Sequence, residues 1–139
     1  MSYTKKMNIY IKIVTLIFLT TFILGCKPEP TETWLCSEDE YVIKLEFYNN
    51  NLFYSSVTGD CHRQGLYVLF DDKNYYEYEM MGDSTLKIIR IGKSSDVSEV
   101  GDFFIFEITR QDNDIFLRYR GINPSIDFVR YYHFKVLQQ

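Results

Sequence analysis

Histidine, tryptophan and proline are scarce in this chain, which has two His, one Trp and three Pro among 139 residues. The sequence also lacks a glycine-rich phosphate loop, a serine nucleophile elbow and any Cys-x-x-Cys or His-x-x-x-His spacing. Glu77 and Glu79 share one face of a predicted strand, where paired carboxylates are expected to form a solvated surface rather than a glycosidase site. We therefore expect a non-enzymatic protein with no catalytic residue, no metal and no cofactor.

Acidic residues are absent before Glu29, and the amino-terminal segment has a polarity of its own. Lys5, Lys6 and Lys12 precede an uncharged, almost wholly apolar run over residues 13–24. As a helix this run would span about 18 Å, well short of a hydrocarbon core of about 30 Å. A positive start followed by a short apolar run predicts a cleaved secretory signal peptide over residues 1–25 rather than a transmembrane anchor.

The residues at the end of this run, Ile-Leu-Gly-Cys at positions 23–26, resemble the lipobox of bacterial lipoproteins. The resemblance implies transfer of diacylglycerol to Cys26, cleavage after Gly25 and acylation of the new amino terminus. Several acyl chains give stable membrane anchoring where a single chain gives only marginal binding. Residues 26–33 are then expected to form an extended tether, because they combine prolines and acidic residues with a lack of large apolar side chains.

The expected location is the cell envelope, with the lipid on Cys26 holding the chain to a membrane. Lys27 occupies the position where some enterobacterial lipoproteins carry an aspartate for retention in the inner membrane, so the resemblance favours the outer membrane. The composition also resembles that of lipoproteins from Bacteroidota. Whether the domain faces the periplasm or the cell surface stays open at this point.

The part that remains after cleavage is acidic. Removal of residues 1–25, which hold three lysines and no acidic residue, lowers the formal net charge from −4 by three units to −7. Nucleic acid is therefore not an expected partner, since its binding needs a basic surface. Two cysteines, Cys36 and Cys61, remain in an oxidising compartment, which predicts a disulfide. A metal site that adds His62 and His133, or two free thiols, are the alternatives.

Residues 34–139 read as one all-β domain built from hairpins. The segment 41–48 alternates apolar and polar side chains, as a half-buried strand does. Polar turns separate further strand-like segments and suit tight hairpins. The expected hairpins are 41–48 with 52–57, 65–70 with 75–80, and 102–110 with 115–120, followed or joined by strands at 84–91 and 127–137. Eight or nine antiparallel strands in a meander predict a small barrel or sandwich.

Two segments fit this pattern less well. The strand at 84–91 places Lys87 and Arg90 on opposite faces, which predicts a bulge or an edge position. The polar segment 92–101, framed by two glycines, is expected to be a long loop.

The meander of short hairpins after an early tryptophan resembles the lipocalin-like lipoproteins. Trp34 stands where such families place a tryptophan that closes the floor of the barrel, although the usual Gly-x-Trp is absent, since Thr31-Glu32 precede Thr33-Trp34. The resemblance implies a barrel that holds a small ligand.

Tyrosine and phenylalanine are the most abundant functional candidates. Adjacent tyrosines point to opposite faces of a strand, so part of them is expected outside the main core. We predict that Tyr76, Tyr78, Tyr131 and Tyr132 bind a small ligand or another envelope component, against the simpler interpretation that they only satisfy β propensity. The alternative function is a protein-binding inhibitor or immunity lipoprotein. A lined apolar interior favours the first function, and a filled core with an exposed aromatic and acidic surface favours the second.

Overall fold

The computed structural model describes residues 28–59, 68–95, 98–121 and 129–138. The predicted signal peptide, the lipidation site Cys26, and Cys61 lie outside the described residues. In the part of the chain that is described, no helix is both long and apolar enough to cross a membrane.

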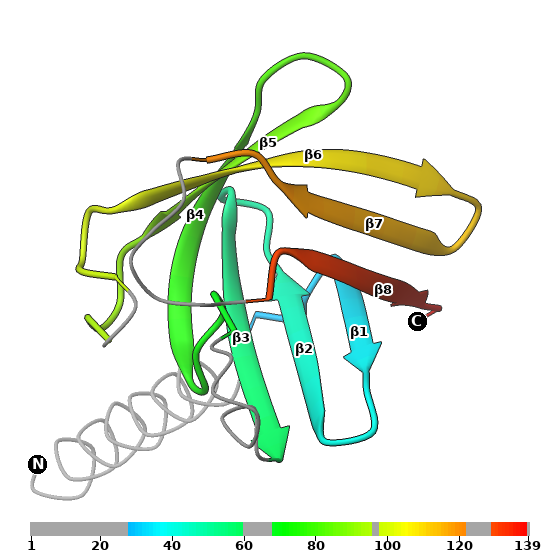
Figure 1. Ribbon diagram of the computed structural model, residues 1–139, viewed down its shortest axis with the longest axis horizontal. Coiled ribbons are helices and arrows are strands. Elements are labelled where there is room, and N and C mark those ends of the chain that lie inside the picture. Colours follow the sequence, from blue (N-terminus) through cyan, green and yellow to red (C-terminus); the bar gives the residue numbers. More distant parts are fainter. Residues whose placement is uncertain (1–27, 60–67, 96–97, 122–128, 139) are drawn as a thin grey trace, which may run out of the picture.

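Eight strands form one closed antiparallel barrel, in which each strand pairs with the next along the chain and β8 pairs with β1 (Figure 1). The all-β meander is confirmed, and it is a barrel rather than a sandwich. An up-and-down barrel of eight strands is the architecture of lipocalins. The strands are β1 (Glu32–Ser37), β2 (Tyr41–Phe47), β3 (Leu52–Gly59), β4 (Asn74–Met80), β5 (Thr85–Arg90), β6 (Phe103–Gln111), β7 (Asp114–Tyr119) and β8 (Tyr131–Leu137).

Strand alternation sets which side chains enter the barrel. In β2, Ile43, Leu45 and Phe47 are buried, whereas the residues between them face outward. Two of the tight turns contain a residue in the left-handed region, Asn51 with φ 59° and Asp112 with φ 54°, as their polar side chains allow. The predicted turns around these two residues are confirmed.

The barrel begins earlier than the sequence pattern indicated. β1 starts at Glu32, so the last two residues of the predicted tether are part of the sheet. Thr33 is buried and lies opposite Leu137 in the register with β8. The barrel therefore closes on residues that looked like a linker.

The predicted hairpin between 65–70 and 75–80 is wrong. β4 pairs with β3 and β5, with Tyr54 opposite Tyr75 in the β3–β4 register. Residues 68–70 are not a strand, and residues 65–67 lie outside the described part of the chain. The physical reason is burial: Val68, Leu69 and Phe70 are all buried, whereas a strand in the barrel wall would expose alternate residues. We call residues 68–71 the plug segment.

Aromatic rings fill much of the interior. Trp34 lies 4.3 Å from Phe47 between ring centroids, and Phe53 stacks on Tyr76 at 4.9 Å. The plug segment adds Phe70, which is almost fully buried. Its ring lies within 5.1–6.2 Å of five others, those of Phe53, Tyr76, Phe106, Tyr132 and Phe134.

The two ends of the barrel differ. Arg90, the last residue of β5, lies near the start of β6, where the backbone N–H of Arg90 donates to the carbonyl of Asp102 at 3.0 Å. Trp34 lies near the other end of β6, because the guanidinium of Arg110 sits 5.3 Å from the centroid of its ring. The end that holds Arg90 is also where the plug segment enters, and we call it the loop end.

Candidate functional site

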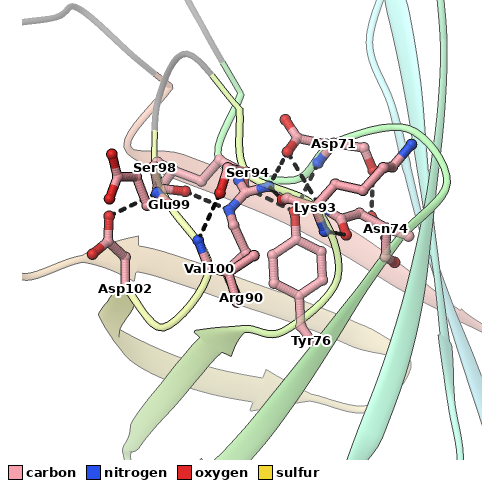
Figure 2. Close-up of polar contacts among 12 residues, drawn as sticks. Asp71, Asn74, Tyr76, Arg90, Lys93, Ser94, Ser98, Glu99, Val100 and Asp102 are labelled. Atoms are coloured by element: carbon pink, nitrogen blue, oxygen red, sulfur yellow. Dashed lines mark hydrogen bonds and ion pairs between the residues drawn. The ribbon is translucent and has the colours of Figure 1, made fainter.

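A fully buried arginine forms the centre of the loop end (Figure 2). Arg90 faces inward on β5, and its guanidinium forms an ion pair with the carboxylate of Asp71 in the plug segment. Its Nε donates to the hydroxyl of Ser98, and one Nη donates to the carbonyl of Lys93 at 2.9 Å. The other Nη lies 3.5 Å from the carbonyl of Leu69. The guanidinium is thus bonded in several directions, as a buried charge requires.

Asn74 links the plug segment to the β5–β6 connection. Its amide nitrogen donates to the carbonyl of Lys93 at 2.9 Å, and its amide oxygen accepts the backbone N–H of Lys93 at 2.7 Å. Gly92 allows this close approach, since a Cβ there would lie 2.0 Å from the Asn74 oxygen. Ser55, from β3, donates its hydroxyl to the carbonyl of Asp71. Three separate parts of the chain therefore meet at the loop end.

Two buried tyrosine hydroxyls hold the backbone of the plug segment. The hydroxyl of Tyr132 accepts the N–H of Leu69 at 2.9 Å, and that of Tyr76 accepts the N–H of Asp71 at 2.9 Å. Burial raises the pKa of Tyr76 to about 12 against the opposing effect of the Arg90 charge. Burial likewise raises the pKa of Tyr132 well above its ordinary value. Both phenols are therefore neutral hydrogen-bonding groups at physiological pH.

The four predicted binding tyrosines do not share one surface. Tyr76 and Tyr132 are core residues inside the barrel, and Tyr78 is partly buried against Phe47 at 5.2 Å. Tyr131 is the exposed one, with 58% of its surface accessible. The alternation of β4 and β8 directs Tyr76 and Tyr132 inward, so these two residues belong to the core and not to an outer surface.

Cys36 carries a free thiol and is buried on the inner side of β1. The predicted Cys36–Cys61 disulfide is therefore not present in this structure, and Cys61 itself lies outside the described residues. Inward alternation explains the difference, since it places Cys36 among core side chains. Burial, and then the charge of Glu38, raise the pKa of Cys36 to about 11, so the thiol is protonated and unreactive at neutral pH.

The alternative metal site is not supported by the described residues either. Within them, no three His, Cys, Asp or Glu side chains gather in a way that could hold a metal ion. His133 faces outward on β8, stacks on Phe116 at 4.6 Å and lies 2.6 Å from Asp114 between Nε2 and Oδ1. His62 lies outside the described part of the chain.

A second candidate site lies on the outer wall of β2–β4. Tyr54 and Tyr75 face each other in the register, and their ring centroids are 4.8 Å apart. Tyr75 is half exposed, and Tyr48 directly follows the end of β2, where the phenols of Tyr54 and Tyr75 contribute to raising its pKa. We call Tyr48, Tyr54 and Tyr75 the tyrosine face.

The sequence contained a usable indication of both sites. Lys87 and Arg90 lie on opposite faces of their strand, which predicts a bulge or an edge position. That prediction is wrong: β5 pairs with both β4 and β6 in regular register, and Arg90 faces inward because it forms a buried ion pair with Asp71. Tyr75 stands next to Tyr76 in the sequence, and the phase of β4 decides which of the two faces outward. Only the register with β3 settles that phase.

No protein-family model, curated protein or solved structure significantly matches this chain. The class of protein is therefore given by its geometry: an eight-stranded antiparallel up-and-down barrel with an aromatic core and a loop end clamped by a buried arginine.

Proposed function

We propose that this chain is a lipid-anchored envelope protein whose barrel is a rigid, non-enzymatic scaffold that binds another protein through the tyrosine face. One observation carries the proposal. The barrel interior is occupied by the chain's own Phe70, whereas the paired rings of Tyr54 and Tyr75 stay outside. A filled core beside an exposed aromatic surface is the combination expected of a protein-binding module.

The chemistry of the loop end agrees with a scaffold role. The Arg90 guanidinium is bonded to Asp71, Ser98 and Lys93, so it is engaged in holding loops together. Such a network fixes the shape of the barrel end. A rigid barrel wall presents the tyrosine face with little loss of conformational freedom on binding, because Tyr has only two side-chain torsions to order.

The anchor part of the proposal rests on the lipobox-like residues 23–26 and on the tether that follows them. With lipid on Cys26, only the five residues 27–31 lie between the lipidated residue and β1, so the reach from Cys26 to Glu32 is roughly 20 Å when extended. The barrel is then held near the membrane, and its partner is expected to be another envelope protein. The outer membrane is the favoured location.

The test compares matched tyrosine variants of the full chain, purified in detergent. Tyr54→Ser/Tyr75→Ser should abolish capture of a specific envelope protein, identified by mass spectrometry and then rebound in purified form. Tyr131→Ser is the control, because Tyr131 is exposed on a different part of the wall. Equal capture by wild type and by the Tyr54/Tyr75 variant would contradict the proposal.

A small-ligand function is the second candidate, and the loop end is the observation that favours it. The hydroxyls of Tyr76 and Tyr132 and the guanidinium of Arg90 point at the plug segment. If that segment withdrew, the same groups would receive the anionic head of an apolar ligand. Dodecanoate binding that strengthens in Phe70→Ala would support this candidate, and its absence in both wild type and variant would exclude it.

A further inference from the structure

The tyrosine face lies in a negatively charged surrounding. Glu46 is the register partner of Tyr54, and Glu77 lies opposite Leu52 on the neighbouring strands. Asp72 lies at the entrance of β4, where its carboxylate accepts the backbone N–H of Val57 at 3.0 Å. Three carboxylates therefore border the exposed Tyr75 and the partly buried Tyr54.

Lys44 compensates only part of this charge. Its ammonium forms an ion pair with Glu46 at 3.0 Å, and among the described residues no ion pair engages the carboxylate of Asp72 or Glu77. Partial burial is the main reason that the pKa values of Tyr48 and Tyr54 are raised, and the negative charge of Glu46 adds to it at both residues. The charge of Asp72 adds to it at Tyr54, where Lys44 acts in the opposite direction.

Exposed aromatic rings add a second attraction for cations. The face of a Tyr ring binds an ammonium or guanidinium group through its quadrupole, and Arg is the more frequent partner. The barrel already uses this contact within its own fold, where Arg110 lies over Trp34 and Arg90 over Tyr76 at 5.4 Å. The tyrosine face offers the same ring chemistry to an outside group.

We propose that the tyrosine face binds a basic segment of a partner protein, with arginine side chains lying on Tyr54 and Tyr75 and pairing with Asp72 and Glu77. This inference rests on the proposed function, and it names the chemistry of the partner. A phosphate-rich or acidic partner is repelled by the same carboxylates. A neutral saccharide could stack on the rings, but its affinity would not depend on salt.

The other exposed tyrosine surface differs in charge and supplies a matched control. Tyr131 lies opposite Arg118 in the β7–β8 register, and Lys135 lies on the same outward side of β8. Tyr131 is the more exposed residue, at 58% against 50% for Tyr75. The same molecule therefore contains an exposed tyrosine, Tyr131, whose register partner is an arginine and not a carboxylate.

The experiment uses the full chain in detergent and an acetylated, amidated hexa-arginine peptide as probe. We expect wild type to bind the peptide measurably at low salt, with affinity falling as sodium chloride is raised. Tyr54→Ser/Tyr75→Ser should weaken binding roughly fivefold to tenfold, and Tyr54→Phe/Tyr75→Phe should retain most of it because the rings remain. Tyr131→Ser should bind like wild type.

Charge variants complete the design. Asp72→Asn keeps a carbonyl oxygen for the Val57 N–H but removes the charge, so it should weaken peptide binding. Glu107→Gln removes the same charge on β6, where Glu107 pairs with Arg120 at 3.5 Å, and should have a smaller effect. Equal losses for these two variants, or for the Tyr54/Tyr75 and Tyr131 variants, would overturn the inference, as would no binding by wild type.

The two proposals can fail separately. If the Tyr54/Tyr75 variant loses a specific envelope partner while wild type ignores hexa-arginine, the docking surface stands and the basic partner is wrong. If partner capture survives the Tyr54/Tyr75 substitutions, the proposed function itself is wrong.

Discussion

Replacing Phe70 with alanine should destabilise the barrel more than any exposed aromatic substitution. Phe70 is about 1% exposed and lies 5.1 Å from the Tyr132 ring and 6.0 Å from the Phe134 ring between centroids. Loss of a buried Phe side chain removes its transfer free energy and leaves a cavity, about 3–5 kcal/mol together. Against a typical total of about 5–15 kcal/mol, that is a large fraction of the free energy of unfolding.

The assay follows from the single tryptophan of the chain. Trp34 is buried in the barrel, so its fluorescence reports unfolding during urea or thermal titration. We expect Phe70→Ala to lower Tm by roughly 15–25 °C for a domain of about 100 residues. Phe103→Ala is the control, because Phe103 is 59% exposed and the Lys87 ammonium lies 5.0 Å from its ring centroid. Phe103→Ala should lower the free energy of unfolding by about 1 kcal/mol or less.

The outcome separates two interpretations of the plug segment. A large loss for Phe70→Ala, with little change for Phe103→Ala, means that the segment is part of the hydrophobic core. Similar small losses for both variants would refute the reasoning, because the plug segment would then contribute no net packing energy.

Three further predictions concern the ion pair, the buried acids and the anchor. Asp71→Asn should lower stability by about 1.5–3 kcal/mol in urea titration, because it removes the charge that compensates the buried guanidinium, whereas Glu79→Gln on the outer wall should change it little. Stability should be full below pH 9 and fall as pH rises to 12, because the folded chain raises the pKa values of Cys36 and Tyr76 to about 11 and 12 from 9.0 and 10.0. Cys36→Ala should reduce the fall between pH 9 and 11, and an unchanged pH profile would contradict the assigned cause. Cys26→Ser should block processing and release or misroute the chain; intact-mass analysis that finds an unlipidated wild-type chain starting elsewhere than residue 26 would contradict the lipid anchor.

The barrel was predictable because its strands alternate. The segment 41–47 carries the period of a half-buried strand, and Asn51 and Asp112 are side chains that tolerate left-handed turns. Local periodicity of this kind is decided within a few residues, so a single sequence reveals it. Local periodicity does not distinguish a barrel from a sandwich, because that choice depends on whether β8 pairs with β1, a strand far from it in the sequence.

The loop end and the tyrosine face were less predictable, because both depend on contacts between segments that are distant in the sequence. Val68, Leu69 and Phe70 look like a buried strand in sequence, and nothing local indicates that they enter the barrel instead. The burial of Arg90 becomes intelligible only when Asp71, nineteen positions earlier, is known to face it. The same dependence on register decided that Tyr75 faces outward.

The pairing of β1 with β8 also has a consequence for folding order. The register that closes the barrel runs from Thr33 opposite Leu137 to Leu35 opposite Lys135, so it joins the two ends of the domain. Every other strand pair links neighbours along the chain and can form as soon as both strands are available. Loop-closure entropy makes the pairing of the most distant strands the slowest to nucleate. Until β8 pairs with β1, the folding chain therefore carries two open sheet edges, which are the parts most prone to pair with another copy.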